Sequence, residues 1–566
     1  MKFRLSSLLI TLLGALALFG EASVRDSRIR CSAGSGPLLQ MRIRADETAT
    51  EEIWRSNLVV IAEHPGCCDE IWFSTGIGVP GLDWHRARAE MLAKAVADVR
   101  KMGIVPSLQF QATLGHGDEF VTPDMCSAKM WTGWTDWKGR ETQYCNCPRQ
   151  PAFHAYLAEV ARAYARVGFS SLWVDDDLRY RNHKPADNAG VHVGCWCDVC
   201  IGAFNKETNG TWTREELGKA VETDQVLASR WRTFAIDGLC QVARTIAVAF
   251  RDVSPSTMMG LQSGNWEDAV DPVRAILKTL HETSGCLVGC RPGGGAYYDD
   301  DPNGIIRKSL KSARFRSRIG DPGYVKLWTP EIESWPRTYY SRSPQGVLAE
   351  GFVALMHGMN GMSFFISNST MENPSLYGET FWTTLAEAAP VLHGYSNAIK
   401  GCTAVGFSNS DSSDVGIRRT AIPVLAGPGR SVGELTKPEC ELNVNTMTSA
   451  DVQKFRDEID RRAGGLPAEV CSPFVGLVQI HVDAQGKLRS VALMNLRISR
   501  QGAIRLLLRN VPPTWQSVEW NEMRHPPLSL ELERIGEEKY VTVPSIDAWN
   551  GGWIGKSRLK PGDGCK

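Results

Sequence analysis

The chain lacks an excess of either charge, because its 63 basic residues are balanced by 63 acidic ones. Nucleic acid and anionic membranes usually select proteins with a basic excess or a basic patch, and neither is found here. We expect no stretch beyond the amino terminus to reach the length of a membrane span. Internal repeats and low-complexity segments are also missing. We therefore expect no nucleic-acid or membrane partner, and 566 residues give room for one large domain with one or two small ones.

The amino terminus carries the one long apolar run. Lys2 and Arg4 precede an apolar stretch at 8–19, and Gly-Glu-Ala at 20–22 forms a small-x-small cleavage pattern. The run is short for a membrane span, and polar sequence follows it closely. We expect residues 1–22 to be a signal peptide and the mature protein to be secreted, into the periplasm or the extracellular space.

Short apolar segments alternate with amphipathic ones from about residue 38 to residue 391, which is typical of βα units around a parallel sheet. Eight candidate strands lie at 39–43, 70–73, 104–108, 171–174, 258–261, 286–289, 325–328 and 361–366, with helices such as 86–102 and 151–167 between them. This pattern predicts a closed (β/α)8 TIM barrel over residues 23–398. A doubly wound dinucleotide-binding fold is the alternative. No G-x-G-x-x-G motif follows the first strand, so we expect no organic cofactor.

The pattern changes after about residue 398. Residues 399–470 contain one clear helix, at 451–462, and predict a small α/β domain. Residues 471–566 instead show short strands separated by turns. The expected strands lie at 474–482, 489–495, 503–508 and 540–543. They predict a C-terminal β-sandwich domain.

Two groups of carboxylates follow predicted barrel strands. Asp175, Asp176 and Asp177 come directly after the fourth strand, and Glu331 and Glu333 come after the seventh. Barrel enzymes keep their chemistry at the carboxyl ends of the strands, so both groups should face the barrel mouth. Such a pair suits cleavage of a glycosidic bond, because one acid protonates the leaving oxygen while one carboxylate attacks or activates water. The alternative is two solvated loops, which the apolar and aromatic flanks argue against.

Polar and aromatic residues near the strand ends are candidates for substrate contacts. Besides Asp175 they are Arg42, Gln109, His116, Asn265, Trp328 and Trp335. Three further tryptophans, Trp131, Trp134 and Trp137, recur at three-residue spacing. They could stack on sugar rings or pack the core of a long loop.

The 16 cysteines make disulfides the default expectation for an exported chain, but their clustering points to another role for some. Cys195, Cys197 and Cys200 form a C-x-C-x2-C motif, and Cys145 and Cys147 lie close together before a predicted helix. Such neighbours cannot easily pair with each other without strain. They are good metal ligands, or halves of separate disulfides.

A Cys-Pro pair at 147–148, a helix, an apolar strand with an acidic tip, and C-x-C-x2-C followed by Phe204 and Asn205 together resemble family 42 glycoside hydrolases. The resemblance implies the same domain order and a retaining, exo-acting, β-galactosidase-like activity on a glycoside or oligosaccharide. It also implies that a homo-oligomer is possible. The structural zinc ion of this family would be held here by Cys147, Cys195, Cys197 and Cys200.

The chain also departs from this family. The family has Asp-Asn-Glu after the fourth strand, with the Glu as acid/base. Here Asp177 occupies the acid/base position, and Asp176 replaces the Asn that contacts the sugar 2-hydroxyl. Glu331 or Glu333 would be the nucleophile, and the sequence leaves both open. The segment between the barrel and the β domain is shorter than the family's.

These departures predict a distinct but related glycosidase, and they keep other hypotheses open. One alternative is a different sugar specificity, such as that of a β-mannosidase. Another is a catalytically inactive carbohydrate-binding barrel. A zinc-dependent hydrolase is a further hypothesis, but four thiolate ligands would leave no open position on the metal.

Overall fold

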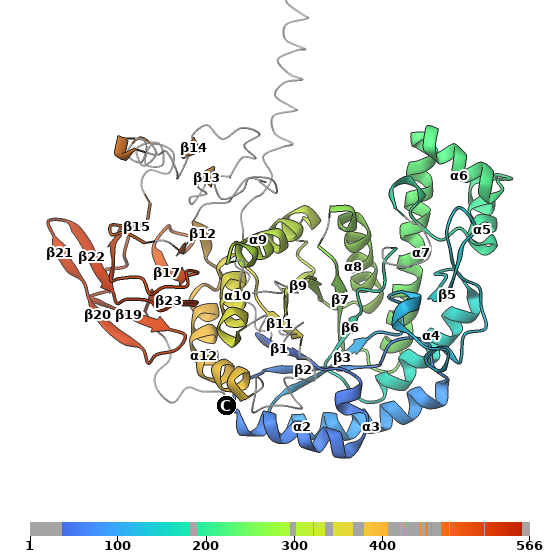
Figure 1. Ribbon diagram of the computed structural model, residues 1–566, viewed down its shortest axis with the longest axis horizontal. Helices are drawn as coiled ribbons and strands as arrows, with labels where there is room; N and C mark the ends of the chain where they lie inside the picture. Colours follow the sequence, from blue (N-terminus) through green and yellow to red (C-terminus); the bar gives the residue numbers. More distant parts are fainter. Residues whose placement is uncertain are drawn as a thin grey trace, which may run out of the picture.

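The computed structural model describes residues 37–180, 189–265, 267–294, 302–320, 322–333, 343–365, 379–405, 420–421, 441–442, 448–450, 454, 466–474, 476–513 and 515–556. A strand-and-helix barrel lies in the middle of the molecule (Figure 1). A β domain lies on one side of it, next to α12 (Glu379–Ala398), and a helical extension lies on the other.

A parallel sheet forms the barrel, with the strand order β10-β11-β1-β2-β3-β6-β7-β8-β9. The strands are β1 (Leu39–Arg42), β2 (Glu70–Ser74), β3 (Val105–Phe110), β6 (Ser171–Val174), β7 (Met258–Ser263), β8 (Val288–Pro292), β9 (Val325–Trp328), β10 (Glu331–Glu333) and β11 (Met362–Phe365). All eight predicted strand positions are confirmed. The largest difference is at β8, which spans 288–292 where the sequence predicted 286–289.

β9 and β10 together fill the seventh position of the barrel. β9 pairs with β8 and β10 pairs with β11, while only Thr329 and Pro330 separate the two in the chain. The Asn360 amide donates to the Trp328 carbonyl at 3.0 Å, and the Ser363 amide donates to the Pro330 carbonyl at 3.0 Å. The sheet therefore continues around the barrel through one bent strand. The predicted (β/α)8 fold is confirmed.

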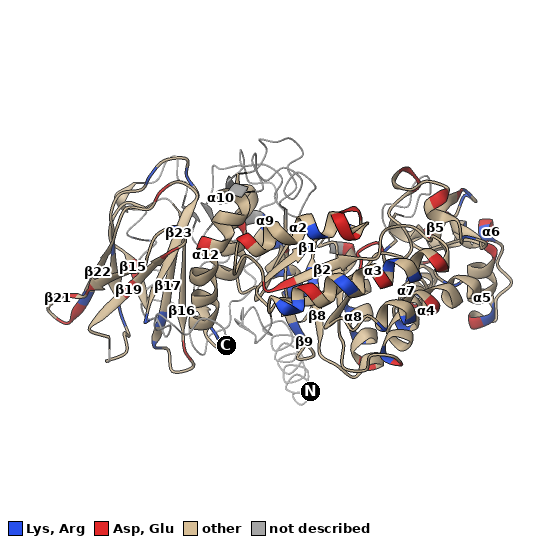
Figure 2. Ribbon diagram, turned by 90° about the horizontal axis from the view of Figure 1, so that it is seen from below, with Lys and Arg blue, Asp and Glu red and all other residues tan. Residues whose placement is uncertain are grey.

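Helices cover the outside of this sheet (Figure 1). They are α2 (Glu51–Glu63), α3 (Leu82–Lys101), α4 (Pro151–Ala165), α7 (Gln225–Arg251), α8 (Val270–Ser284), α9 (Pro302–Ile319), α10 (Pro344–Met356) and α12. Within the described ranges, α7 is the one helix long and apolar enough to cross a membrane, and 61% of its most apolar window is buried. It packs against α4 and α8, which explains that apolar face. Lys and Arg are interspersed with Asp and Glu over the helices, as the balanced composition predicts (Figure 2).

The barrel interior is packed with aromatic rings. Trp72 and Trp173 stack with their ring centroids 4.1 Å apart. A Cβ atom at Gly260 or Gly289 would overlap the Trp173 ring, so glycine on β7 and β8 makes room for it. At the amino ends of the strands the interior becomes polar, and Glu70 is fully enclosed there.

Two excursions leave the barrel near the cysteine motifs. A hairpin of β4 (Gly133–Thr135) and β5 (Glu141–Asn146) follows β3, while α5 (Asp198–Thr208) and α6 (Arg214–Thr223) form the extension before α7. The three tryptophans of the hairpin region pack internally. Trp134 is fully buried, Trp131 contacts the Phe153 ring, and Trp137 stacks on the His192 ring with centroids 4.3 Å apart. This favours the core-packing interpretation of all three.

The C-terminal domain contains two antiparallel sheets around an apolar core. One has the order β12 (Thr403–Val405), β16 (Leu477–Val482), β17 (Leu488–Asn495), β23 (Asn550–Gly555), β19 (Ser517–Glu522) and β20 (Leu528–Glu531). The other has the order β15 (Ala468–Val470), β18 (Ile504–Leu508), β22 (Glu538–Val543) and β21 (Glu533–Ile535). The predicted β domain is thus present.

The part predicted as a small α/β domain contributes to these same sheets. β12 pairs with β16, and β15 pairs with β18, so both strands belong to the β domain although the sequence placed them before it. A separate pair, β13 (Thr420–Ala421) and β14 (Glu441–Leu442), is also described. Most of the predicted helix at 451–462 lies outside the described residues.

Candidate active site

Charged side chains from several strands converge at the carboxyl end of the barrel. β1 ends at Arg42, β3 supplies Gln109, β8 supplies Arg291, and β10 begins at Glu331. The three aspartates at 175–177 directly follow β6. In a parallel barrel these strand ends meet at one face, so residues distant in the sequence become neighbours.

Glu331 is enclosed by two arginines. Its Oε2 atom lies 2.6 Å from Arg42 Nη1 and 2.5 Å from Arg291 Nη1, and Arg291 is only 1% exposed. Burial alone would raise the pKa of Glu331, but Arg291 and Arg42 outweigh burial and hold that pKa below its usual range. Glu331 is therefore a carboxylate with a side chain only 12% exposed that favours the ionised form, which is the state a nucleophile needs.

The first two aspartates after β6 have opposite environments. Asp175 Oδ2 accepts hydrogen bonds from Gln109 Nε2 at 2.7 Å and from Gln262 Nε2 at 3.4 Å. Burial and the two neighbouring aspartates raise the pKa of Asp175 to about 7. Asp176 instead pairs with Arg179 at 2.6 Å. Burial opposes the charged form of Asp176, but the surrounding arginines outweigh burial and lower its pKa.

The third aspartate, Asp177, is paired with a histidine and an arginine. His116 Nδ1 lies 2.8 Å from Asp177 Oδ1, and Arg179 Nη2 lies 3.5 Å from the same oxygen. The Asp177 side chain is 5% exposed and that of His116 is 39% exposed. The hydrogen bond to Asp177 raises the pKa of His116 despite partial burial. His116 is thus the more exposed member of the pair.

Arg291 connects the two predicted carboxylate centres. Its Nη1 contacts Glu331, and its Nη2 lies 3.9 Å from Asp176 Oδ1. Sequence reasoning missed both Arg291 and Arg179. A signal was present for each, since Arg291 is a lone charge beside an apolar strand and Arg179 follows the aspartates by two residues. The observed end of β8 brings Arg291 into the site.

The remaining candidates differ in their placement. Asn265 is 6% exposed, and its Nδ2 atom has no hydrogen-bond partner among the described residues, so it remains suited to a substrate hydroxyl. Trp328 is fully buried with the Arg316 guanidinium over its ring, so it packs in the barrel wall away from any sugar. The backbone of Glu333 lies in β10, but its side chain and all of Trp335 are outside the described part of the chain.

A cavity of about 230 Å³ opens beside the aspartates. Its polar end is formed by Asp176, Arg179 and Gln262, and its apolar end by side chains of α7 and α8 such as Leu239 and Ile276. A pocket with a few convergent polar groups and an apolar wall is typical of a small-molecule site.

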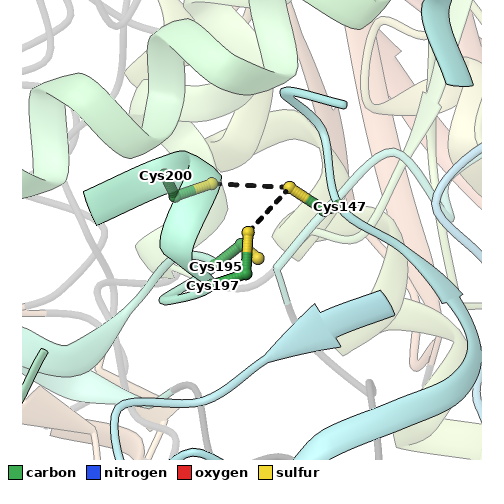
Figure 3. A group of neighbouring side chains, drawn as sticks. All are labelled: Cys147, Cys195, Cys197 and Cys200. Atoms are coloured by element: carbon green, nitrogen blue, oxygen red, sulfur yellow. Dashed lines mark hydrogen bonds between the residues drawn. The ribbon is translucent and has the colours of Figure 1, made fainter. Parts of the chain in front are cut away.

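The four cysteines predicted as metal ligands converge at one point (Figure 3). Cys147 Sγ lies 3.4 Å from both Cys197 Sγ and Cys200 Sγ. The four sulfur atoms all lie within 4.8 Å of one another. Tetrahedral zinc with Zn–S bonds of about 2.3 Å would separate its sulfurs by roughly 3.8 Å, so the group fits a zinc site with four thiolate ligands. All four are buried, and all 13 described cysteines are free thiols. The described cysteines therefore form no disulfide, contrary to the default expectation.

The architecture is that of known glycoside hydrolases. A catalytic mutant of Gan42B, a GH42 β-galactosidase from G. stearothermophilus, matches with a TM-score of 0.52 at 11% identity, over 94% of this chain and 100% of that one. The β-galactosidase from Bacillus circulans sp. alkalophilus matches with a TM-score of 0.50 at 11% identity, over 93% and 99%. Searches of protein-family models and of curated proteins give no match. The expected resemblance to family 42 is therefore confirmed for the fold.

Proposed function

We propose that the protein is a glycoside hydrolase with its active site at the barrel mouth. The observation that supports this most is the pair of opposed carboxylate centres, Glu331 on one side and the aspartates after β6 on the other, joined through Arg291. Glycosidic cleavage requires one group that stays ionised and another that delivers a proton, on opposite sides of the scissile bond.

Glu331 is the proposed nucleophile. Its two arginine partners favour the ionised form and fix the carboxylate in one orientation. Attack on the anomeric carbon would give a covalent glycosyl-enzyme, which water then hydrolyses with net retention. The proton for the leaving group would come from the centre after β6, where the sequence match proposes Asp177 and where Asp176 lies beside the cavity.

The proposed substrate is the terminal sugar of a β-glycoside, and galactosides are the first choice because the two similar structures reported above are β-galactosidases. Exo-action is proposed from the resemblance to family 42 glycoside hydrolases. Gln109, Arg42 and Asn265 are the proposed sugar contacts.

A panel of 2,4-dinitrophenyl β-glycosides of galactose, glucose, mannose, xylose and arabinose tests this function. Release of dinitrophenolate from at least one member by the purified wild-type protein is expected. Binding of a monosaccharide with no hydrolysis of any member would instead identify a catalytically inactive carbohydrate-binding barrel.

We also propose that Cys147, Cys195, Cys197 and Cys200 hold one structural zinc ion. Four thiolates would close the coordination sphere, so the metal would tie the β4–β5 hairpin to the start of α5 and take no part in the reaction. Metal analysis should find one zinc per chain, and Cys197→Ser should lose it and lower the unfolding temperature. Cys240→Ser, at a buried cysteine on α7 outside this group, is the control and should keep the metal. Absence of zinc from the wild-type protein would contradict the assignment.

Export is the third proposal. The charged start, the apolar run at 8–19 and the small-residue site at 20–22 support cleavage after about residue 22 and secretion. Amino-terminal sequencing of the protein from its native host tests this, and an intact amino terminus would contradict it.

A further inference from the structure

The group that would donate the proton in the proposed reaction is itself poorly placed to do so. Asp177 is one methylene shorter than the Glu of the resembled family, and its side chain is 5% exposed. Its Oδ1 atom is already paired with His116 at 2.8 Å and with Arg179 at 3.5 Å. An oxygen already held by two donors, on a side chain that is almost buried, is poorly placed to reach a leaving group.

His116 is the more exposed member of its pair with Asp177. It follows β3 on the mouth side of the barrel, and its ring packs edge-on against Phe120 with centroids 4.5 Å apart. Nδ1 donates to Asp177, which fixes both the tautomer and the plane of the ring. Nε2 has no hydrogen-bond partner among the described residues, and the side chain is 39% exposed. The ring therefore presents a second nitrogen that can exchange protons.

We propose that His116 is the general acid and base of this glycosidase, and that Asp177 is the positioning residue that orients and charges its imidazole. The inference rests on the proposed hydrolase function and assigns the proton-transfer step within it. The arrangement has the same logic as a carboxylate that orients a catalytic histidine in other enzymes. The imidazole is bonded to Asp177 through Nδ1 and is the more exposed of the two side chains, so its Nε2 atom is the more accessible proton donor.

The proton and electron balance is complete with groups of this chain and water. In the first step the Nε2 proton of the His116 imidazolium passes to the glycosidic oxygen, which keeps the electron pair of the breaking bond. Glu331 supplies the electron pair of the new bond to the anomeric carbon. In the second step Nε2 takes a proton from water as the resulting hydroxide displaces Glu331, which regenerates the imidazolium and the free carboxylate.

Several charged groups act on His116. Asp177 accepts its hydrogen bond, Asp176 adds a second negative charge, and Arg179 lies 3.3 Å from Nδ1 and opposes them. The net effect raises the pKa of His116, so the imidazolium persists further toward neutral pH than in a free histidine. Because the acid must be protonated, activity should fall as pH rises through this pKa.

Two variants of the full-length protein test the assignment, one at His116 and one at a comparable histidine that serves as the control. His116→Asn should lower kcat/KM on alkyl or disaccharide β-glycosides by about 10²- to 10⁴-fold, and on 2,4-dinitrophenyl glycosides by less than about tenfold, because dinitrophenolate leaves without protonation. His393→Asn removes a histidine of similar exposure that also pairs with an aspartate, Asp69 at 3.2 Å, outside the mouth. It should leave both rates unchanged. Equal losses on both substrate classes for His116→Asn would overturn the proposal.

The pH profile of kcat/KM separates His116 from Asp177. His116→Asn should abolish the basic limb, while Asp177→Asn should keep that limb and move it to lower pH, because the histidine loses the partner that raises its pKa. If Asp177 were the acid, Asp177→Asn would abolish the limb and His116→Asn would move it to higher pH, which would overturn the proposal. A folded His116→Gln variant whose pH profile keeps the basic limb would also overturn the proposal. Failure of the wild-type protein on every glycoside would reject the hydrolase function itself, a different outcome from all of these.

Discussion

Each end of the barrel interior holds a glutamate with little exposure, 1% for Glu70 and 12% for the Glu331 side chain, but the partners of the two differ. At the amino end, Glu70 Oε2 accepts from Gln40 Nε2 at 2.5 Å, and Oε1 accepts from the hydroxyls of Ser107 and Ser171. At the carboxyl end, Glu331 is paired with two arginines. Burial raises the pKa of Glu70, and its neutral hydrogen-bond donors offset this effect of burial only in part. The arginines instead lower the pKa of Glu331.

This difference separates a structural carboxyl group from a reactive one. A buried glutamate with neutral partners is stable when protonated and ties four strands together by hydrogen bonds. A largely enclosed glutamate between arginines is kept charged at a cost in desolvation, which is typical of a functional site.

The largest effect is expected at Glu331, and it distinguishes this residue from Glu333, the other glutamate of β10. Glu331→Gln keeps the shape of the side chain but removes the nucleophile, so kcat/KM should fall on the order of 10⁴- to 10⁶-fold. Glu333→Gln should lose far less, since the arginine contacts belong to Glu331. Steady-state kinetics on the best aryl glycoside measure both. The reverse order of losses would make Glu333 the nucleophile.

A smaller effect is expected when one arginine is removed. Arg291→Met should lower kcat/KM by about 10²- to 10³-fold. It should also move the acidic limb of the pH profile to higher pH, because Glu331 loses the partner that most lowers its pKa. Arg88→Met is a matched control, since Arg88 is also buried but donates to the Ser74 carbonyl at 2.9 Å. Arg88→Met should lose stability without moving the acidic limb. An acidic limb that stays in place in Arg291→Met would contradict the role of Arg291.

The smallest effect is expected at the amino end of the barrel. Glu70→Gln should leave kcat and KM nearly unchanged. A raised pKa in the folded state means that Glu70 stabilises the fold below its unfolded pKa near 4.5, and that this contribution is lost as pH rises through the folded value. The unfolding temperature of Glu70→Gln relative to wild type should therefore increase between pH 4 and pH 8. A constant difference across that range would show that Glu70 is not buried in protonated form.

The sequence predicted the strands well because each barrel strand is a short apolar run. It placed β8 too early, since Arg291 interrupts the apolar pattern, and this hid the residue that joins the two carboxylate centres. The cysteine group could be predicted because its spacing is local. The ion pairs of the mouth could not, because Arg42 and Glu331 lie 289 positions apart and only the closed barrel brings them together. His116 was named as a mouth residue, but only its contact with Asp177 suggests its role.

The identity of the nucleophile can be tested directly by trapping the covalent intermediate. The wild-type protein would be incubated with the 2,4-dinitrophenyl 2-deoxy-2-fluoro analogue of its best glycoside, then digested and sequenced by mass spectrometry. A stoichiometric fluorosugar ester on Glu331 is expected. A label on Glu333 or on any aspartate at 175–177, or turnover of the unmodified substrate with inverted product and no label, would contradict it.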